Sequence, residues 1–156
     1  PFIVGHFEKR NRHIATENIE KVYHLFKGHT YYIQKTFNEA FDDTPEEEEC
    51  TLETIQAAID NMIAANDTIF REILSNIPEK QKELLYAIAK DGEAERITSS
   101  EFIKRHSLTS ASSVQSASKK LLDKDIITEI NKAFSVTDKL FAMWINQLYG
   151  NNKNTL

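Results

Sequence analysis

The order of elements predicted for residues 98–136, two short helices and then a β-hairpin, constrains the fold more than any other feature of the sequence. The first helix begins at a capping box, because Thr98 precedes Glu101 by three residues. The hydroxyl of Thr109 or Ser110 caps the second helix. Its inner face consists of apolar residues at helical spacing: Val114, Ala117, Leu121 and Leu122. The segment therefore predicts a helix–turn–helix whose second helix has a polar outer face.

The hairpin follows the second helix directly. Residues 126–130 and 133–136 form its two strands, and Asn131 and Lys132 suit the two-residue turn between them. A helix–turn–helix followed by a two-stranded wing is the order of elements in a winged helix. Such a fold presents its second helix outward, toward a DNA groove or a protein partner.

Helical periodicity extends over most of the remaining chain. Amphipathic helices are expected over residues 17–27, 31–41, 51–77, 79–91 and 138–149. Thr16 is the expected N-cap of the first of these helices, and Gly28 is expected to end it. A polar gap at Asn66–Asp67 predicts a bend in the long third helix. Ile77-Pro78 ends that helix and is the expected domain boundary.

These elements predict a mainly α fold class in three parts. A helical bundle is expected over residues 1–77, and a winged helix-turn-helix domain with a small β-hairpin wing over residues 78–150. The polar residues 151–156 are expected to form a disordered tail. The 156 residues are 40% hydrophobic and 28% charged, which is ordinary for a soluble globular protein with one or two small domains.

Charge and cysteine content restrict the partners and the setting. Residues 1–78 contain 7 Lys and Arg against 14 Asp and Glu, whereas residues 79–156 contain 12 against 10. A nucleic-acid partner would therefore favour the second half. No apolar stretch is long enough to cross a bilayer, so we expect no membrane partner. The single Cys50 cannot form an internal disulfide, and a cytoplasmic location is expected.

Sequence motifs for nucleotide and metal chemistry are absent. The spacing that a P-loop or a Rossmann fingerprint requires is missing from the four glycines, Gly5, Gly28, Gly92 and Gly150. No two of the five histidines are four residues apart, and Glu46–Glu49 is interpreted as a solvated loop. Cys50 lies in an acidic stretch that raises the pKa of its thiol. We therefore expect no catalytic residue, no metal site and no cofactor in this chain alone.

The outer face of the second helix is the main candidate binding surface. It carries Ser112, Ser113, Gln115, Ser116, Lys119 and Lys120, and the wing adds Lys132. Serine and glutamine can hydrogen-bond to base edges, and lysine can contact phosphate. The preceding helix adds Lys104, Arg105 and His106. In the alternative interpretation, the small serines pack against another protein domain, and the composition favours DNA and protein contact equally.

A second unusual cluster is GHTYYIQ at residues 28–34. The adjacent Tyr31 and Tyr32 point to different faces of a helix, so they cannot both lie in a core. One buried ring and one interface ring is the favoured interpretation. The alternative is a surface that meets another domain or a flat ligand ring.

Several segments together resemble a known family. They are the apolar start PFI, GHTYYIQ, IFREILSNIPEKQKELLYAIA, TSSEFIKRHSLTSASSVQSASKKLLDKDIIT and SVTDKLFAMWINQLYG. From about Phe2 to Tyr149, the chain resembles the C-terminal half of the archaeal-ATPase-type P-loop proteins, which belong to the STAND branch related to AAA+ ATPases. Members of that family usually carry GHPYY, and Thr30 stands here in place of the proline.

The resemblance implies a helical lid over residues 1–77, a winged helix, and a missing N-terminal P-loop domain as partner in cis. It implies that the full-length protein is an ATPase using ATP and Mg²⁺, and that Gly28, His29 and Tyr31 face the nucleotide. The chain begins at Pro1 inside an apolar run, which fits the back half of a larger protein.

Three functional hypotheses follow. In the first, the lid closes on the nucleotide and the winged helix contacts DNA or a partner protein. In the second, the chain is a stand-alone transcription regulator that dimerises through its N-terminal helices. In the third, the winged helix is a protein-docking module only.

Overall fold

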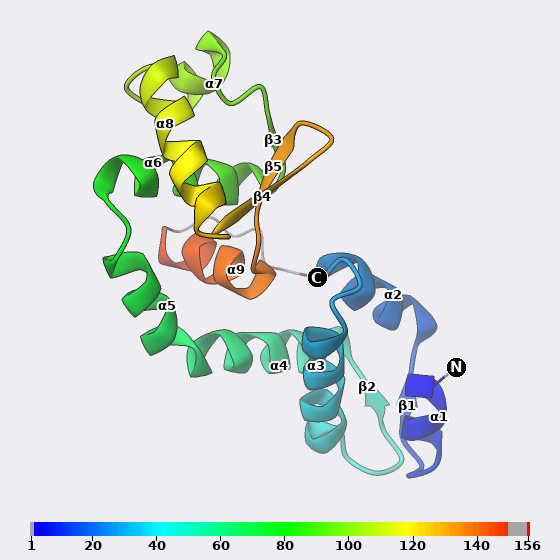
Figure 1. Ribbon diagram of the computed structural model, residues 1–156. Helices are drawn as coiled ribbons and strands as arrows, with labels where there is room; N and C mark the ends of the chain where they lie inside the picture. Colours follow the sequence, from blue (N-terminus) through cyan, green and yellow to red (C-terminus); the bar gives the residue numbers. More distant parts are fainter. Residues whose placement is uncertain (1, 150–155) are drawn as a thin grey trace. The chain divides into compact units, whose positions relative to one another are not determined.

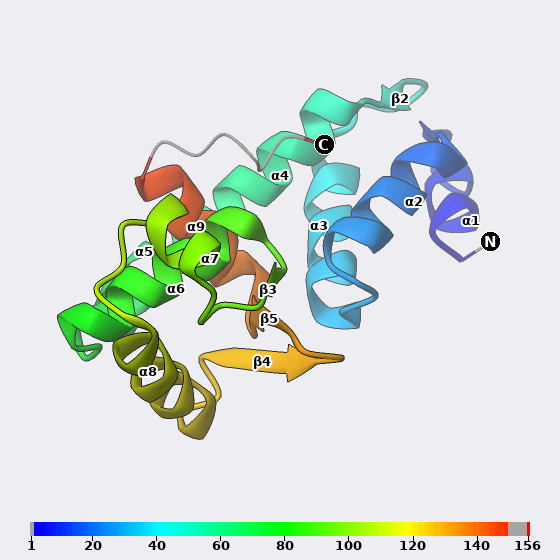
Figure 2. The same cartoon turned by 90° about the horizontal axis from the view of Figure 1, so that it is seen from above.

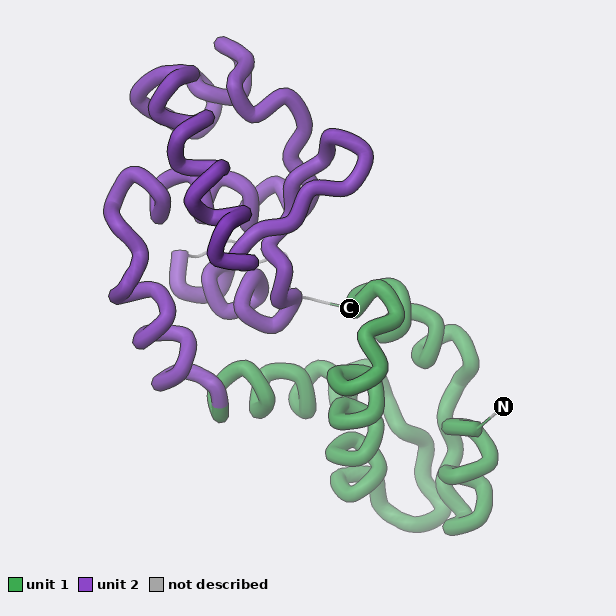
Figure 3. Tube along the Cα trace, in the orientation of Figure 1, with its two compact units in different colours: residues 1–65, 155–156 green, residues 66–154 purple. Residues whose placement is uncertain are grey.

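The computed structural model describes residues 2–149 and Leu156, and it is mainly helical (Figures 1 and 2). The chain forms two compact units, and the division lies between Ala65 and Asn66 (Figure 3). The predicted end of the last helix at Gly150 and most of the predicted tail, residues 151–156, lie outside the described residues.

The first unit is built from helices with one short parallel strand pair. Its elements are α1 (Phe2–Glu8), β1 (His13–Ile14), α2 (Thr16–Leu25), α3 (Thr30–Asp43), β2 (Glu49–Cys50) and α4 (Leu52–Ala65). α3 packs against α4, and the core residues include Val22, Phe26, Ile33, Phe37, Ile55, Ile59 and Met62. β1 and β2 pair with Ile14 opposite Cys50. Neither α1 nor this strand pair was expected from the sequence.

One prediction about α2 is wrong. Thr16 is the first helical residue and not the N-cap, because β1 ends at Ile14 and the chain turns into the helix at Ala15. Tyr23 of the same helix is 56% exposed.

The end of α2 requires a glycine. Lys27 and Gly28 both have positive φ, at 50° and 77°, and the Gly28 N–H donates to the Tyr23 carbonyl at 3.0 Å. A β-carbon at Gly28 would lie 3.0 Å from the Tyr23 hydroxyl oxygen. Both the backbone angle and the space therefore favour glycine at this position.

The second unit begins one helix earlier than the predicted boundary at Ile77-Pro78. Its elements are α5 (Asp67–Ser75), α6 (Glu79–Asp91), β3 (Ala94–Glu95), α7 (Ser100–Arg105), α8 (Ala111–Asp123), β4 (Ile127–Ile130), β5 (Ala133–Val136) and α9 (Lys139–Leu148). The predicted break at Asn66–Asp67 is confirmed, since α4 and α5 are separate helices. It is also the place where the units divide.

α5 belongs to the second unit because it packs against α9. The Phe70 ring lies 5.2 Å from the Phe141 ring and 5.8 Å from the Trp144 ring, between ring centroids. The Trp144 indole N–H donates to Asp67 Oδ1 at 2.8 Å. The sequence analysis placed α5 in the first domain, because a helical period shows which residues are buried but not against what.

The remaining elements form the predicted helix–turn–helix and wing. α6 packs against α8 and α9, and the hairpin β4–β5 pairs antiparallel with Glu129 opposite Phe134. β3, which was not predicted, adds a third strand in the order β3-β5-β4. Asn131 and Lys132 have φ of 52° and 67°, so the two-residue turn is confirmed, with both central residues in the left-handed region.

Of the two N-caps predicted in this unit, one is confirmed. Ser110 Oγ accepts from the Ser113 N–H at 3.2 Å and caps α8. α7 is an exception, because Ser99 rather than Thr98 is the N-cap and its Oγ accepts from the Phe102 N–H. Both adjacent residues carry a hydroxyl, so the sequence alone could not distinguish them.

Candidate functional site

The outer face of α8 is exposed over most of its length. Val114, Ala117 and Leu121 are buried on the inner side, as predicted, which turns the polar residues outward. Leu122, which was also predicted on that side, is only half-buried. The side chains of Ser112, Gln115, Ser116, Lys119 and Lys120 are exposed, and Ser113 is half-buried. Ser110 and Ser112 share a hydrogen bond at 3.1 Å between their hydroxyl oxygens. α8 therefore presents hydroxyl and amide groups in its first half and ammonium groups in its second.

The wing extends this surface beyond α8. Figure 2 shows the β4–β5 hairpin projecting from the helices of the second unit. Lys132 lies at its turn and is exposed, and the neighbouring Ile130 is 64% exposed. Glu129 and Asn131 are also exposed. The wing thus offers one cation, one anion and one apolar side chain.

Three of the predicted lysines keep free charges. Among the described residues, Lys119, Lys120 and Lys132 form no ion pair. Their ammonium groups are therefore available to an anionic partner.

The helix before α8 contributes less charge than its sequence suggests. The Arg105 guanidinium is paired with the Asp91 carboxylate, and His106 Nε2 lies 3.2 Å from the same carboxylate. The His106 ring is also packed 4.5 Å from the Phe102 ring, between centroids. Only Lys104 of the three basic residues at 104–106 is exposed without such a partner in the described part of the chain. Asp91 is fourteen residues away from Arg105, so sequence spacing gave no sign of this pairing.

One residue that positions the start of α8 was not expected from the sequence. Lys80 of α6 donates from Nζ to Thr109 Oγ1 at 2.8 Å and to Glu83 at 3.0 Å. This contact fixes the turn between α7 and α8 on the body of the domain. Its signal in the sequence is weak, because Lys80 and Thr109 are far apart in the chain.

The residues predicted to face a nucleotide lie around the turn between α2 and α3. The His29 ring stacks on the Tyr32 ring at 4.9 Å between centroids, and Tyr31 is 59% exposed. The prediction that the two tyrosines do not both lie in a core is confirmed, since Tyr32 is half-buried. Thr30 is the first residue of α3, a position where proline is common in helices.

A cavity of about 370 Å³ lies beside this turn, between α1, α2 and α3. Gly28 and Thr30 line it together with apolar residues such as Phe7 and Phe37, whereas His29 and Tyr31 do not. The structure therefore does not bring Gly28, His29 and Tyr31 around one cavity.

Cys50 and the acidic run Glu46–Glu49 are the other groups of the first unit that the sequence singled out. Burial is the main cause that raises the pKa of the Cys50 thiol, and the neighbouring Glu49 carboxylate adds to it. The direction of this shift is as predicted, although the sequence analysis had ascribed it to the acidic stretch alone. Glu46–Glu49 are exposed, as expected, but only Glu46–Glu48 lie in a loop, because Glu49 belongs to β2 and pairs with His13.

The family model described as "Probable winged helix domain" matches residues 68–147. These are 80 of the 156 residues, just over half of the chain. The chain belongs to this winged helix family. The match begins inside α5, so the family includes the helix that the structure assigns to the second unit. No curated protein and no solved structure matched the chain.

The winged helix domain and the helix–turn–helix within it are thus shown by both the fold and the family. Domains of this kind bind DNA or protein partners. Over residues 2–149, no helix of the protein combines the length and the apolar character needed to cross a membrane.

Proposed function

We propose that the winged helix domain binds duplex DNA, with α8 in the major groove and the wing turn against the phosphate backbone. The observation that carries this proposal is the row of small polar side chains on α8 flanked by Lys119, Lys120 and Lys132, whose charges are unpaired within the described residues. Serine and glutamine would contact base edges, and the three lysines would contact phosphates.

The electrostatic contribution has a predictable size. Three phosphate contacts release about 2.7 counterions, so affinity should fall roughly 40-fold between 50 and 200 mM salt. Arg105 adds nothing in this proposal, because Asp91 already holds it. We therefore expect weak binding with limited sequence preference, since arginine supplies the commonest guanine contact.

Salt-dependent binding of the whole chain to a fluorescent duplex tests the proposal. Anisotropy titrations at several KCl concentrations give the slope of log affinity against log salt. Replacing Lys119, Lys120 and Lys132 by glutamine should each reduce that slope by about one. Lys9→Gln is the matched control, because it removes the same charge from the exposed surface of the first unit. No binding, or equal slopes for all variants, would exclude DNA contact through α8.

A protein partner is the second candidate for the same surface. Ile130 at the wing is 64% exposed, and the small serines of α8 would allow close approach of another domain. Such a partner would bind with little salt dependence and would be weakened by Ile130→Ser. The titrations above separate the two candidates.

We further propose that the chain is the regulatory part of a P-loop ATPase of the archaeal-ATPase type. In this proposal, a P-loop domain elsewhere in the protein binds ATP and Mg²⁺, and the chain itself has no catalytic role. The first unit would act as a lid through Gly28, His29 and Tyr31. The resemblance of the sequence supports this proposal, together with the glycine-dependent turn at Gly28 and the exposed ring of Tyr31. A cytoplasmic location would follow.

The stand-alone regulator is the alternative, with the helices of the first unit as the dimer contact. A Gly-Lys-Ser/Thr loop upstream of Pro1 in the reading frame would favour the ATPase. Sedimentation of the chain distinguishes the two as well, because a stable dimer is expected only of the stand-alone regulator.

A further inference from the structure

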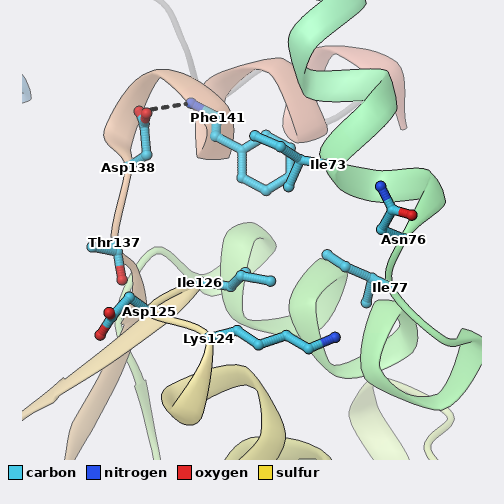
Figure 4. Close-up of a pocket in the computed structure, with 9 residues that line it drawn as sticks. All are labelled: Ile73, Asn76, Ile77, Lys124, Asp125, Ile126, Thr137, Asp138 and Phe141. Carbon is cyan, nitrogen blue, oxygen red and sulfur yellow. Dashed lines mark hydrogen bonds between the residues drawn. The ribbon is translucent and has the colours of Figure 1, made fainter.

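A cavity of about 440 Å³ lies in the second unit, where α8 joins the wing (Figure 4). Its apolar wall includes Ile73 of α5, Ile77 after it, Ile126 before β4, and Phe141 of α9. Ile77 and Phe141 are each only 3% exposed, so their positions are fixed by the core. The volume is in the range of sites that bind small organic molecules.

One charged side chain of the rim is directed along the cavity. Figure 4 shows Lys124 extending toward Ile77, whereas the neighbouring Asp125 points in the opposite direction. Within the described part of the chain, the Lys124 ammonium has no ion pair.

The other carboxylate at the rim is already engaged. Asp138 Oδ1 accepts from the backbone N–H groups of Leu140 at 2.8 Å and Phe141 at 3.1 Å, and so caps α9. Its charge is partly balanced by the positive end of that helix. The cavity therefore offers an apolar wall and one available ammonium group.

We propose that this cavity binds small organic acids that carry an apolar body, with the carboxylate paired to Lys124 Nζ. The body would lie against Ile73, Ile126 and Phe141. Lys124 is an exposed residue, and its ammonium can form a charge-assisted hydrogen bond with a carboxylate. A neutral molecule of the same shape would gain only the apolar contact.

The cavity lies at the connection between α8 and the wing. Asp125 has φ of 54°, and the N–H groups of Asp125 and Ile126 donate to the carbonyls of Leu122 and Leu121 at 3.0 Å. On the other side of the hairpin, the Thr137 N–H donates to the Ile126 carbonyl, also at 3.0 Å. A bound acid would therefore contact the backbone segment that sets the angle between α8 and the hairpin.

The site can be tested by titrating the full ¹⁵N-labelled chain with 3-phenylpropionate. We expect saturable shifts of the amide signals of residues 124–126 and 137–141. Lys124→Met should weaken binding about tenfold, the usual effect of losing a charged hydrogen-bond partner. Lys9→Met is the matched control, because Lys9 is also an exposed lysine and does not line the cavity. It should leave the dissociation constant unchanged.

A neutral probe separates charge from shape. 3-Phenylpropionamide should bind the wild type about tenfold more weakly than the acid and should not distinguish Lys124→Met from the wild type. The proposal is overturned if the acid does not saturate, if Lys124→Met binds as tightly as the wild type, or if the shifts map to the cavity between α1 and α3. None of these readouts involves DNA, so a failure of this site is distinguishable from a failure of DNA binding.

Discussion

Replacing Phe70 by alanine should destabilise the winged helix domain, although Phe70 lies outside the helix–turn–helix. The side chain is 4% exposed, and its ring contacts those of Phe141 and Trp144. Burial of a phenylalanine removes roughly 150–250 Å² from water, which at about 25 cal/mol per Å² amounts to about 4–6 kcal/mol. Truncation of buried phenylalanines costs about 3–5 kcal/mol, in agreement with this value.

The assay is urea unfolding followed by the fluorescence of Trp144, the single tryptophan of the chain. With a slope of about 2 kcal/mol per M, a loss of 4 kcal/mol lowers the unfolding midpoint by about 2 M. Ile69→Ala is the control, because Ile69 is the neighbouring residue of α5 and is 55% exposed. We expect it to change stability by less than about 0.5 kcal/mol.

The comparison of the two midpoints tests where α5 belongs. If α5 were part of the first unit only, Phe70→Ala would change the signal of Trp144 but leave the midpoint of its transition unchanged. Equal midpoints for Phe70→Ala and Ile69→Ala would refute the assignment of α5 to the winged helix domain.

Two further predictions concern a pair of glycines and one carboxylate. Because Gly28 has a positive φ, Gly28→Ala should lower the free energy of unfolding, measured in urea, by at least about 1 kcal/mol. Gly5 lies in an open position of α1, so Gly5→Ala should raise the free energy of unfolding by about 0.5 kcal/mol. Equal effects of the two substitutions would contradict this reasoning. Hydrogen bonds from Arg71 and Trp144 hold the pKa of Asp67 below its ordinary value of 3.8. The ionised Asp67 carboxylate therefore stabilises the fold above pH 3.8, and this stabilisation is lost as the pH falls through the lowered pKa of Asp67. Trp144 fluorescence should change in that pH range in the wild type and should not change in Asp67→Asn.

Much of the secondary structure could be predicted because its causes are local. The hydrophobic periodicity places the helices, and the hydroxyl of Ser110 caps α8. The turn at Asn131 and Lys132 depends on two residues that tolerate positive φ. The same helical periodicity predicts the exposed face of α8, because burial of Val114, Ala117 and Leu121 on one side turns the serines and lysines to the other side.

The missed features depend on contacts between distant parts of the chain. β1 pairs with β2 across more than thirty residues, and each has only two residues, too few for a sequence pattern. β3 is equally short and is recognised only by its pairing with β5. The charge of Arg105 is likewise neutralised by an ion pair with Asp91, which belongs to another helix.

The sequence by itself determined the helices from α2 to α9, the wing and the polar outer face of α8, because periodicity, caps and turn residues act within a few positions of one another. Only the tertiary structure decided that α5 packs with the winged helix domain, which lysines keep free charges, and where a cavity opens beside Lys124. These properties arise from packing and ion pairing between elements that are far apart in the chain, and no local pattern specifies such a pairing.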